Sequence, residues 1–244
     1  VRNPIDGKFY LIATDLRIQA GKGWRAAQEQ GSRDLMVWES PDLIHWSEQW
    51  ACRVGLEEAG CVWAPEAVYD REREAFLVFF ASMIKGEGEK AGKQRIYAAY
   101  TRDFRKFSET FLYMERENHV IDTTILESGG IFYRISKDET EKVLILEQAD
   151  SLLGKFTRIQ SPTLDALKGV EGPEGYLLPD GNTWCLIADR FAEGKGYLPM
   201  LTNDLSSGCF RILEPDQYDM GLTRKRHGGI LAITDEEWKR LWQQ

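Results

Sequence analysis

The chain has 244 residues, of which 43% are apolar and eight are Trp, enough for one large domain or two small ones. The formal net charge of −8 argues against nucleic acid and anionic membranes as partners, because both select basic surfaces. No apolar run approaches the roughly 18 residues that a membrane-spanning helix needs. Neutral partners such as sugars remain open, and the Trp content is compatible with them.

The four cysteines lack the paired spacing of zinc sites, so we expect no zinc centre. They are Cys52, Cys61, Cys185 and Cys209. Buried free thiols are the favoured interpretation, and a disulfide between Cys52 and Cys61 stays open. No signal peptide is visible in the sequence. The compartment is open between secreted, periplasmic and cytoplasmic, with the first two favoured, and the oligomeric state is open.

A repeated unit organises the chain. The first predicted hairpin joins the β-rich runs 9–15 and 35–40. Three further hairpins are predicted in chain order: 74–82 with 94–101, 130–136 with 142–148, and 183–189 with 197–202. Each second run leads into an aspartate, a turn and an aromatic residue. These aspartates are interpreted as turn formers: Asp42, Asp103, Asp150 and Asp204.

A short run before each later hairpin is interpreted as the innermost strand of a blade. These runs are 64–70, 121–128 and 171–178, and a fourth, 226–234, has no hairpin after it. Continuous apolar runs predict strands covered on both faces, as in stacked blades. A β-sandwich is the alternative, but sandwiches lack a recurrent hairpin followed by an aspartate.

We therefore predict an all-β fold, a five-bladed β-propeller forming a single domain over residues 1–244. The blades are assigned to 1–50, 62–115, 119–160 and 169–213, with 226–234 as the innermost strand of the fifth. The first and last blades are incomplete in this chain. We expect sequence upstream of Val1 to supply the missing strands, because a closed ring leaves no open sheet edge.

A short C-terminal helix is predicted at 235–243. Thr234 and Glu237 form a capping box at its start. Trp238, Leu241 and Trp242 form an apolar stripe, which we expect to cover the sheets.

The innermost strands of a propeller line its channel, so their first residues gather at one mouth. These positions carry Trp63, Glu66, Asp122, Glu171, Arg226 and His227. Acids, a cation and an indole around one pocket suit carbohydrate hydrolysis, which uses a protonated acid and a second carboxylate. Arg190 is a further cation for sugar hydroxyls. For Trp63 and Glu66, blade packing and a salt bridge stay open as alternatives.

Glu174 lies three residues after Glu171 in the same predicted strand. Because side chains alternate along a strand, it should point to the opposite face. We therefore interpret Glu174 as structural.

Five motifs in chain order, FYLIATD, WAPEAVYD, VIDTTI, EGP and RHG, resemble those of glycoside hydrolase family 43. The resemblance implies a five-bladed propeller that cleaves arabinose- or xylose-containing oligo- or polysaccharides with inversion, as arabinofuranosidases and xylosidases do. It implies that Glu171 is the general acid and that Asp122 adjusts the acid's proton affinity and orients substrate. His227 would line the channel, often beside a bound calcium or water in that family. No cofactor is required.

One departure from the family concerns the general base, an aspartate on the first innermost strand. Residues 1–8 contain Asn3 where that aspartate could align, but they fit better as the turn after that strand. The aspartate would then precede Val1, and the chain alone should be inactive. A non-catalytic carbohydrate-binding propeller is the alternative. The fructan-cleaving family of five-bladed propellers fits the acidic motifs poorly.

Overall fold

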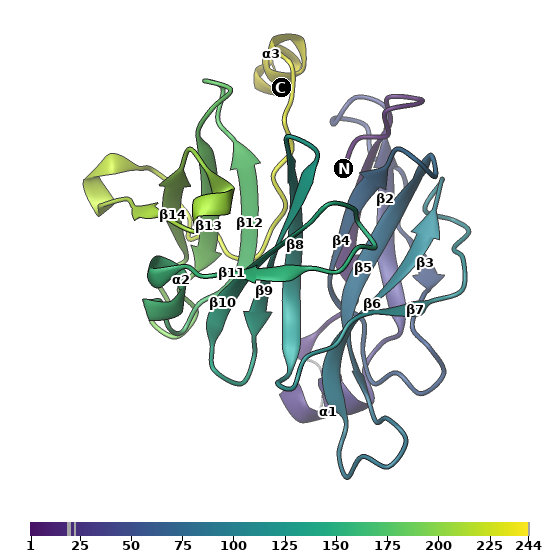
Figure 1. Ribbon diagram of the computed structural model, residues 1–244. Coiled ribbons are helices and arrows are strands. Elements are labelled where there is room, and N and C mark those ends of the chain that lie inside the picture. Colours follow the sequence, from purple (N-terminus) through teal and green to yellow (C-terminus); the bar gives the residue numbers. More distant parts are fainter. Residues whose placement is uncertain (19–20, 22, 244) are drawn as a thin grey trace. The chain divides into compact units, whose positions relative to one another are not determined.

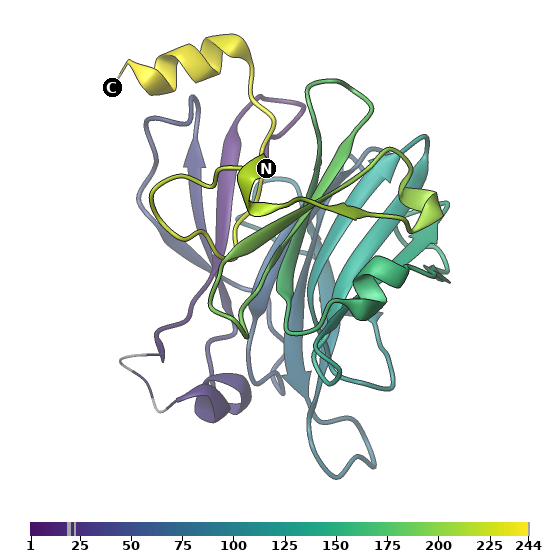
Figure 2. The same cartoon turned by 90° about the vertical axis from the view of Figure 1, so that its left-hand side faces the viewer.

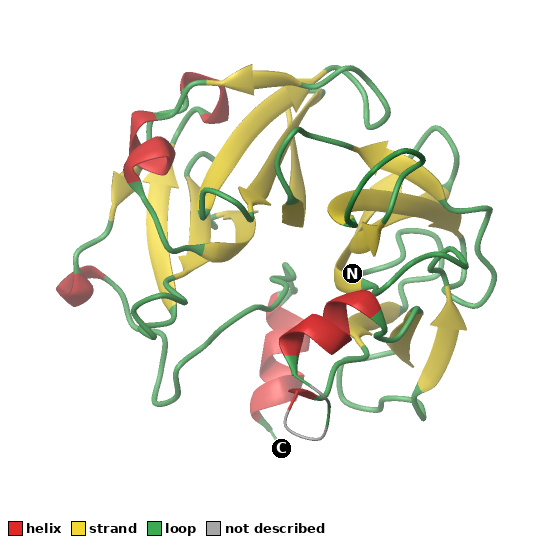
Figure 3. Ribbon diagram, turned by 90° about the horizontal axis from the view of Figure 1, so that it is seen from below, coloured by secondary structure: helices red, strands yellow, loops and turns green. Residues whose placement is uncertain are grey.

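Strands dominate the computed structural model, which describes residues 1–18, 21 and 23–243 (Figure 1). In these residues the strands form four antiparallel sheets, each built from strands that are consecutive in the chain. Helices are few and short (Figure 3). The predicted all-β class is confirmed. The chain divides into two compact units, Val1–Met114 with Leu231–Gln244, and Glu115–Ile230.

The first unit holds two sheets and two short helices. One sheet contains β1 (Phe9–Thr14), β2 (Asp34–Ser40) and β3 (Trp50–Arg53). The other contains β4 (Trp63–Asp70), β5 (Ala75–Ile84), β6 (Lys93–Thr101) and β7 (Phe111–Met114). The helices are α1 (Trp24–Glu29) and α3 (Asp235–Trp242).

The second unit also holds two sheets. The first contains β8 (Val120–Ser128), β9 (Ile131–Asp138), β10 (Val143–Ala149) and β11 (Thr157–Ile159). The second contains β12 (Glu171–Leu177), β13 (Trp184–Asp189), β14 (Tyr197–Thr202) and β15 (Arg211–Ile212). The helix α2 (Pro162–Ala166) contacts β10 (Figure 2), and two 3₁₀ turns, η2 (Leu205–Ser207) and η3 (Pro215–Gln217), complete the unit.

Each unit has its own apolar core, built from the runs that predicted the hairpins. In the first unit, the fully buried Phe104 contacts Tyr10 and Phe76, with ring centroids 4.6 and 4.9 Å apart. In the second, Leu144 and Leu186 are buried in one cluster. Burial on both faces explains why these strands are continuously apolar rather than alternating.

Three of the four aspartates after the hairpins, Asp42, Asp103 and Asp204, act as turn formers. Asp42 Oδ1 accepts from the backbone N–H groups of Ile44 and His45. Asp103 Oδ1 accepts in the same way from the backbone N–H groups of Arg105 and Lys106, and Asp204 Oδ1 accepts from the backbone N–H of Ser206. A carboxylate that binds its own turn needs no catalytic explanation.

The C-terminal helix is confirmed, but its apolar stripe is not a cover. The capping box of Thr234 and Glu237 is formed, and Arg2 Nη2 lies 2.5 Å from Glu237 Oε2. Trp238 and Trp242 contact each other, yet they are 53% and 71% exposed. The stripe therefore leaves much of its apolar surface in solvent.

The predicted fifth innermost strand is not formed. Residues 226–234 are all described, and none of them is in a strand. The described part of the chain contains four sheets, so the five-bladed architecture is seen only in part. A β-strand forms by hydrogen bonding to a neighbouring strand. The described residues after this segment form a helix and not a hairpin, so they provide no neighbouring strand.

All four cysteines lie in described residues and all are free thiols, Cys209 exposed and the other three buried. The open alternative of a bond between Cys52 and Cys61 is therefore not realised. Among the described helices, none is long and apolar enough to cross a membrane.

Candidate functional site

Three innermost strands carry a β-bulge at the end where the site residues were predicted. The strand register shifts between these pairs: Trp63 and Glu66 in β4, Ile121 and Thr123 in β8, and Glu171 and Glu174 in β12. One residue in each bulge has a left-handed backbone, namely Ala64 (φ 46°), Asp122 (φ 46°) and Gly172 (φ 53°). Bulges change the direction of side chains and are common beside functional sites. Here a bulge occurs at the start of each of these three strands.

The bulge in β12 removes the argument that placed Glu174 opposite to Glu171. Glu171 pairs with Asp189 and Glu174 pairs with Ile187, so three steps on β12 match two steps on β13. Asp189 and Ile187 are two residues apart, so their side chains lie on the same face of β13. Both glutamates therefore lie opposite residues of one face. Simple alternation along the strand does not hold across a bulge.

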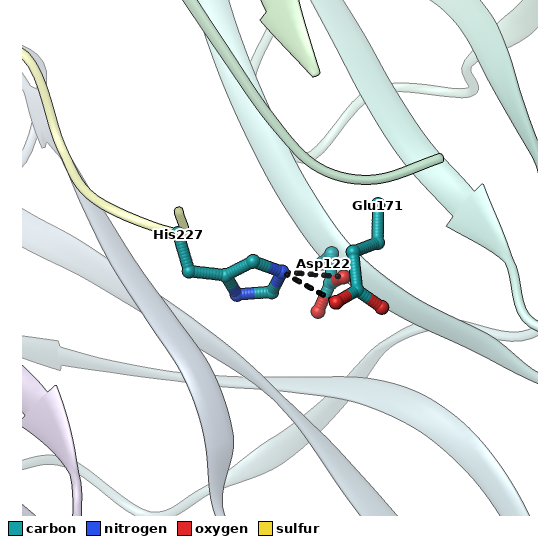
Figure 4. Close-up of side chains that lie close together, drawn as sticks. All are labelled: Asp122, Glu171 and His227. Atoms are coloured by element: carbon teal, nitrogen blue, oxygen red, sulfur yellow. Dashed lines mark ion pairs between the residues drawn. The ribbon is translucent and has the colours of Figure 1, made fainter. Parts of the chain in front are cut away.

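Asp122, Glu171 and His227 converge in the second unit (Figure 4). His227 Nε2 lies 3.5 Å from Asp122 Oδ2 and 3.5 Å from Glu171 Oε1. The sequence predicted this grouping from residues that are far apart in the chain. Asp122 comes from the bulge of β8, Glu171 from the first position of β12, and His227 from the coil that follows η3.

Asp122 is buried, with 7% of its surface exposed. Its Oδ2 accepts a 3.0 Å hydrogen bond from the N–H of Gly172, which ties the β8 bulge to the β12 bulge. Burial raises the pKa of Asp122, and the negative charge of Glu171 adds to the rise. His227, Lys137 and the Gly172 hydrogen bond act the other way without cancelling it.

Two cations hold Glu171. Lys137 Nζ donates to Glu171 Oε2 at 2.8 Å, and Arg226 Nη2 donates to Oε1 at 3.2 Å. Arg226 is fixed in turn by Asp189, whose Oδ2 accepts from Nε at 2.6 Å. The hydrogen bond to Asp189 and the charges of Asp189 and Glu171 raise the pKa of Arg226 against the opposing effect of burial. Arg226 was predicted to bind sugar, and in this structure it binds the two acids.

Lys137, near the end of β9, is 2% exposed. Its Nζ lies 2.6 Å from Glu139 Oε2 and 4.4 Å from the ring centre of Phe191. Burial alone would lower the pKa of Lys137, but the hydrogen bonds to Glu139 and Glu171 outweigh it and the pKa is raised. Lys137 is therefore a buried cation between two glutamates.

Gly172 has no room for a side chain. A Cβ there would lie 2.5 Å from Cδ2 of His227, and the residue has φ of 53°. We expect Gly172→Ala to displace His227 and strain the bulge, which lowers sugar affinity or hydrolysis about tenfold or more and reduces stability by about 1 kcal/mol. Gly129→Ala is a matched control, because Gly129 also has positive φ (61°) but nothing within 4 Å of its Cβ position. Equal losses in both variants would show that backbone strain alone, and not His227, is responsible.

The other predicted site residues are not members of this cluster. Trp63 and Glu66 belong to the first unit, where Trp63 meets the exposed Trp24 of α1 edge-on at 6.1 Å. Arg190 donates to the backbone carbonyls of Gly196 and Tyr197, so it holds its own turn. Its role in sugar binding stays a prediction.

Sequence reasoning missed Lys137, Glu139 and Asp189. Lys137 directly follows the predicted run 130–136, and Asp189 ends the run 183–189. A charged residue at the end of a strand is usually interpreted as exposed to solvent. Only the pairing of β9 with β8, and of β13 with β12, places them against the site. No local signal in the sequence distinguishes them.

Asp122, Glu171 and His227 each place one metal-binding atom within 4.8 Å of the others. Calcium takes about six to eight oxygen ligands, whereas this set offers two carboxylates and a nitrogen. Both oxygens of Glu171 also contact cations. The set does not fit calcium on its own, and the predicted calcium beside His227 would need oxygen ligands from elsewhere.

Comparison with known proteins identifies relatives. A family model described as a probable glycosyl hydrolase domain, related to glycoside hydrolase family 43, matches residues 1–239. The chain is 31% identical over 229 residues to an α-L-arabinofuranosidase of Bifidobacterium longum subsp. longum. The match takes in 76% of this chain and 21% of that protein, so the chain spans about a fifth of the relative's length.

Solved structures share the fold. A family 117 glycoside hydrolase from the marine bacterium Zobellia galactanivorans matches with a TM-score of 0.61 and 16% identity, over 85% of this chain and 66% of that one. GH43B of the Bacteroides ovatus xyloglucan PUL matches with 0.56 and 18%, over 88% and 39%. At these identities the likeness shows the fold alone. It confirms the predicted all-β propeller.

Proposed function

Because the chain belongs to the glycoside hydrolase family 43-related domains, we propose that it cleaves glycosidic bonds in arabinose- or xylose-containing plant glycans. The observation that carries the proposal is the convergence of Glu171 and the buried Asp122 beside His227. In this assignment Glu171 gives its proton to the leaving oxygen. Asp122 supplies the negative neighbour that favours a protonated partner.

The spacing of the two acids is too short for an inverting pair, so inversion would need a base from elsewhere. An inverting pair stands about 6.5–9.5 Å apart to admit a water, whereas Asp122 and Glu171 place oxygens within 4.8 Å of each other. Asp122 is also a poor nucleophile, because its carboxylate is buried and its Oδ2 accepts the hydrogen bond from Gly172. Asp122 therefore assists Glu171 and does not attack the sugar.

We place the base upstream of Val1. Val1 and Tyr10 exchange backbone hydrogen bonds, as antiparallel strands do, and the N–H of Ile5 donates to Asn3 Oδ1 within the turn between them. This supports the interpretation of residues 1–8 as the turn after an innermost strand. The base would lie on that strand, and hydrolysis would require it.

The left-handed backbone of His227 supports a fifth blade. His227 has φ of 25°, so Arg226-His227-Gly228 repeats the left-handed position of the bulges at Ala64, Asp122 and Gly172. Residues 226–234 would become an innermost strand once neighbouring strands from outside this chain pair with them.

The arabinofuranosidase relative favours an arabinosyl substrate, and the xylosidase type is the second choice. The test is hydrolysis of nitrophenyl α-L-arabinofuranoside and nitrophenyl β-D-xyloside, by the chain alone and with its natural upstream sequence restored. We expect turnover only with the upstream sequence. Absence of turnover in both, for every arabinosyl and xylosyl substrate, would overturn the proposal.

A non-catalytic sugar-binding domain is the second candidate. It is favoured by one observation: both oxygens of Glu171 contact cations, Lys137 on Oε2 and Arg226 on Oε1, so each oxygen is already engaged within the protein. It predicts sugar-dependent quenching of Trp fluorescence without hydrolysis, even with the upstream sequence present.

A further inference from the structure

Lys137, Arg226 and His227 contact the carboxylate of Glu171, and the contact from Lys137 is the shortest of the three, 2.8 Å from Nζ to Oε2. It reaches this atom from a different sheet, since β9 carries Lys137 and β12 carries Glu171. A lysine that is 2% exposed has few rotamers available, so its ammonium fixes the position of Oε2.

The ammonium is itself held from behind. Glu139 Oε2 lies 2.6 Å from Nζ, and Glu139 is also paired with Lys142. The hydrogen bonds from Lys137 and Lys142 lower the pKa of Glu139 against the effect of burial. Lys142, Glu139, Lys137 and Glu171 thus form a row of alternating charges. In this row, the attraction between neighbours offsets the cost of removing the charged groups from water.

On the opposite side, Arg226 holds Oε1 of Glu171 and is itself held by the fully buried Asp189. The two oxygens of Glu171 thus contact cations that differ in their exposure to solvent. Arg226 is 46% exposed in its side chain, so a substrate can reach and displace it, whereas Lys137 is enclosed.

We propose that Lys137 is a positioning residue for Glu171, which fixes Oε2, leaves Oε1 for the glycosidic oxygen, and stabilises the carboxylate left after proton transfer. The inference rests on the proposed function. During cleavage the bond between the anomeric carbon and the glycosidic oxygen breaks, and that oxygen takes the proton from Glu171. A water bonds to the anomeric carbon on the opposite face and gives its proton to the base from the upstream sequence. Negative charge then develops on Glu171, and the fixed ammonium is in contact with it.

The charges around Glu171 come from three elements besides its own. Lys137 on β9 and Arg226 favour the carboxylate, Asp122 on β8 disfavours it, and His227 favours it when protonated. Removal of Lys137 leaves Asp122 opposed by the more exposed cations alone. The pH at which Glu171 loses its proton should then move upward.

The test compares Lys137→Met with Lys137→Arg and with Arg134→Met. Arg134 is a matched control, because it is also a buried cation on β9, paired with Glu147 at 2.8 Å and not with Glu171. The first readout is ¹³C NMR of the Glu171 carboxyl in this chain, assigned by its loss in Glu171→Gln. The second is the pH profile of hydrolysis with the upstream sequence present.

For Lys137→Met we expect the midpoint of the Glu171 titration and the alkaline limb of the hydrolysis profile to rise by about one pH unit or more. Lys137→Arg should restore both, and Arg134→Met should move neither. Unchanged midpoints in Lys137→Met, or an equal shift in Arg134→Met, would overturn the proposal. The NMR readout does not need hydrolysis, so it separates this inference from the proposed function.

If Lys137→Met fails to fold, Glu139→Gln takes its place. This variant keeps the Lys137 ammonium but removes the negative charge of Glu139 beside it. The midpoint should then fall, because Lys137 is left with Glu171 as its remaining carboxylate partner at this position. A midpoint that rises or stays fixed would contradict the role given to Lys137.

Discussion

A Glu171→Gln variant is expected to lose about 10²–10⁴-fold in hydrolysis of natural glycans, the usual contribution of a general acid. Glutamine keeps the size of the side chain and can still contact Lys137, but it carries no transferable acidic proton. Substrates with nitrophenolate leaving groups need little protonation, so their turnover should fall much less. The measurement is kcat/KM on a nitrophenyl glycoside and on an oligosaccharide with the same sugar, with the upstream sequence present.

Glu174→Gln is the matched control for this prediction. Glu174 lies on the same strand, on the other side of the bulge, and is not one of the three side chains that converge at the site. It should leave both substrates within a few-fold of the parent. Equal losses on both leaving groups in Glu171→Gln would assign Glu171 to sugar binding, and no loss would remove it from the mechanism.

Asp122→Asn is expected to lower hydrolysis by about tenfold or more, equivalent to about 1.4 kcal/mol in the barrier. The amide can still accept the hydrogen bond from Gly172, so the two bulges stay tied. What is lost is the negative charge beside Glu171, and with it part of the tendency of that residue to hold a proton. The pH profile of the variant should have its alkaline limb at lower pH than the parent.

The same substitution has a stability effect of defined sign. Burial raises the pKa of Asp122 above its ordinary value of 3.8, so the folded state binds the proton more tightly than the unfolded state. The stabilisation is complete below 3.8 and is lost as pH rises through the folded-state value. Asp122→Asn should therefore gain stability relative to the parent between pH 3 and pH 7, measured by urea unfolding.

Asp204→Asn is the control of opposite sign. Hydrogen bonds from the side chain and backbone of Ser206 lower the pKa of Asp204, so its stabilisation is present above 3.8 and is lost as pH falls. This variant should lose stability relative to the parent at pH 7, with the difference shrinking toward low pH. Parallel trends in the two variants would contradict the environment described for Asp122.

Much of the fold followed from local patterns. The run 74–82 predicted a strand covered on both faces, and β5 is buried over nearly its whole length. The aspartates after the hairpins were recognised because turn chemistry is local. The helices α1 and α2 were missed, because at six and five residues they carry too few positions for a periodic pattern.

The site was predictable only in part. Glu171, Asp122 and His227 were identified from motif order, and they do converge. Their contacts with Lys137 and Asp189 depend on strand pairing and on the bulges, which no local pattern encodes. The face of Glu174 was mispredicted for the same reason, since one inserted residue cancels the alternation.

The most direct test is a crystal structure of Glu171→Gln, with the upstream sequence present, bound to an arabinosyl or xylosyl oligosaccharide. The account predicts a glycosidic oxygen that accepts a hydrogen bond of about 3.2 Å or less from the amide NH₂ group at position 171, while the amide oxygen accepts from Lys137. A sugar bound with its glycosidic bond remote from position 171 would contradict it.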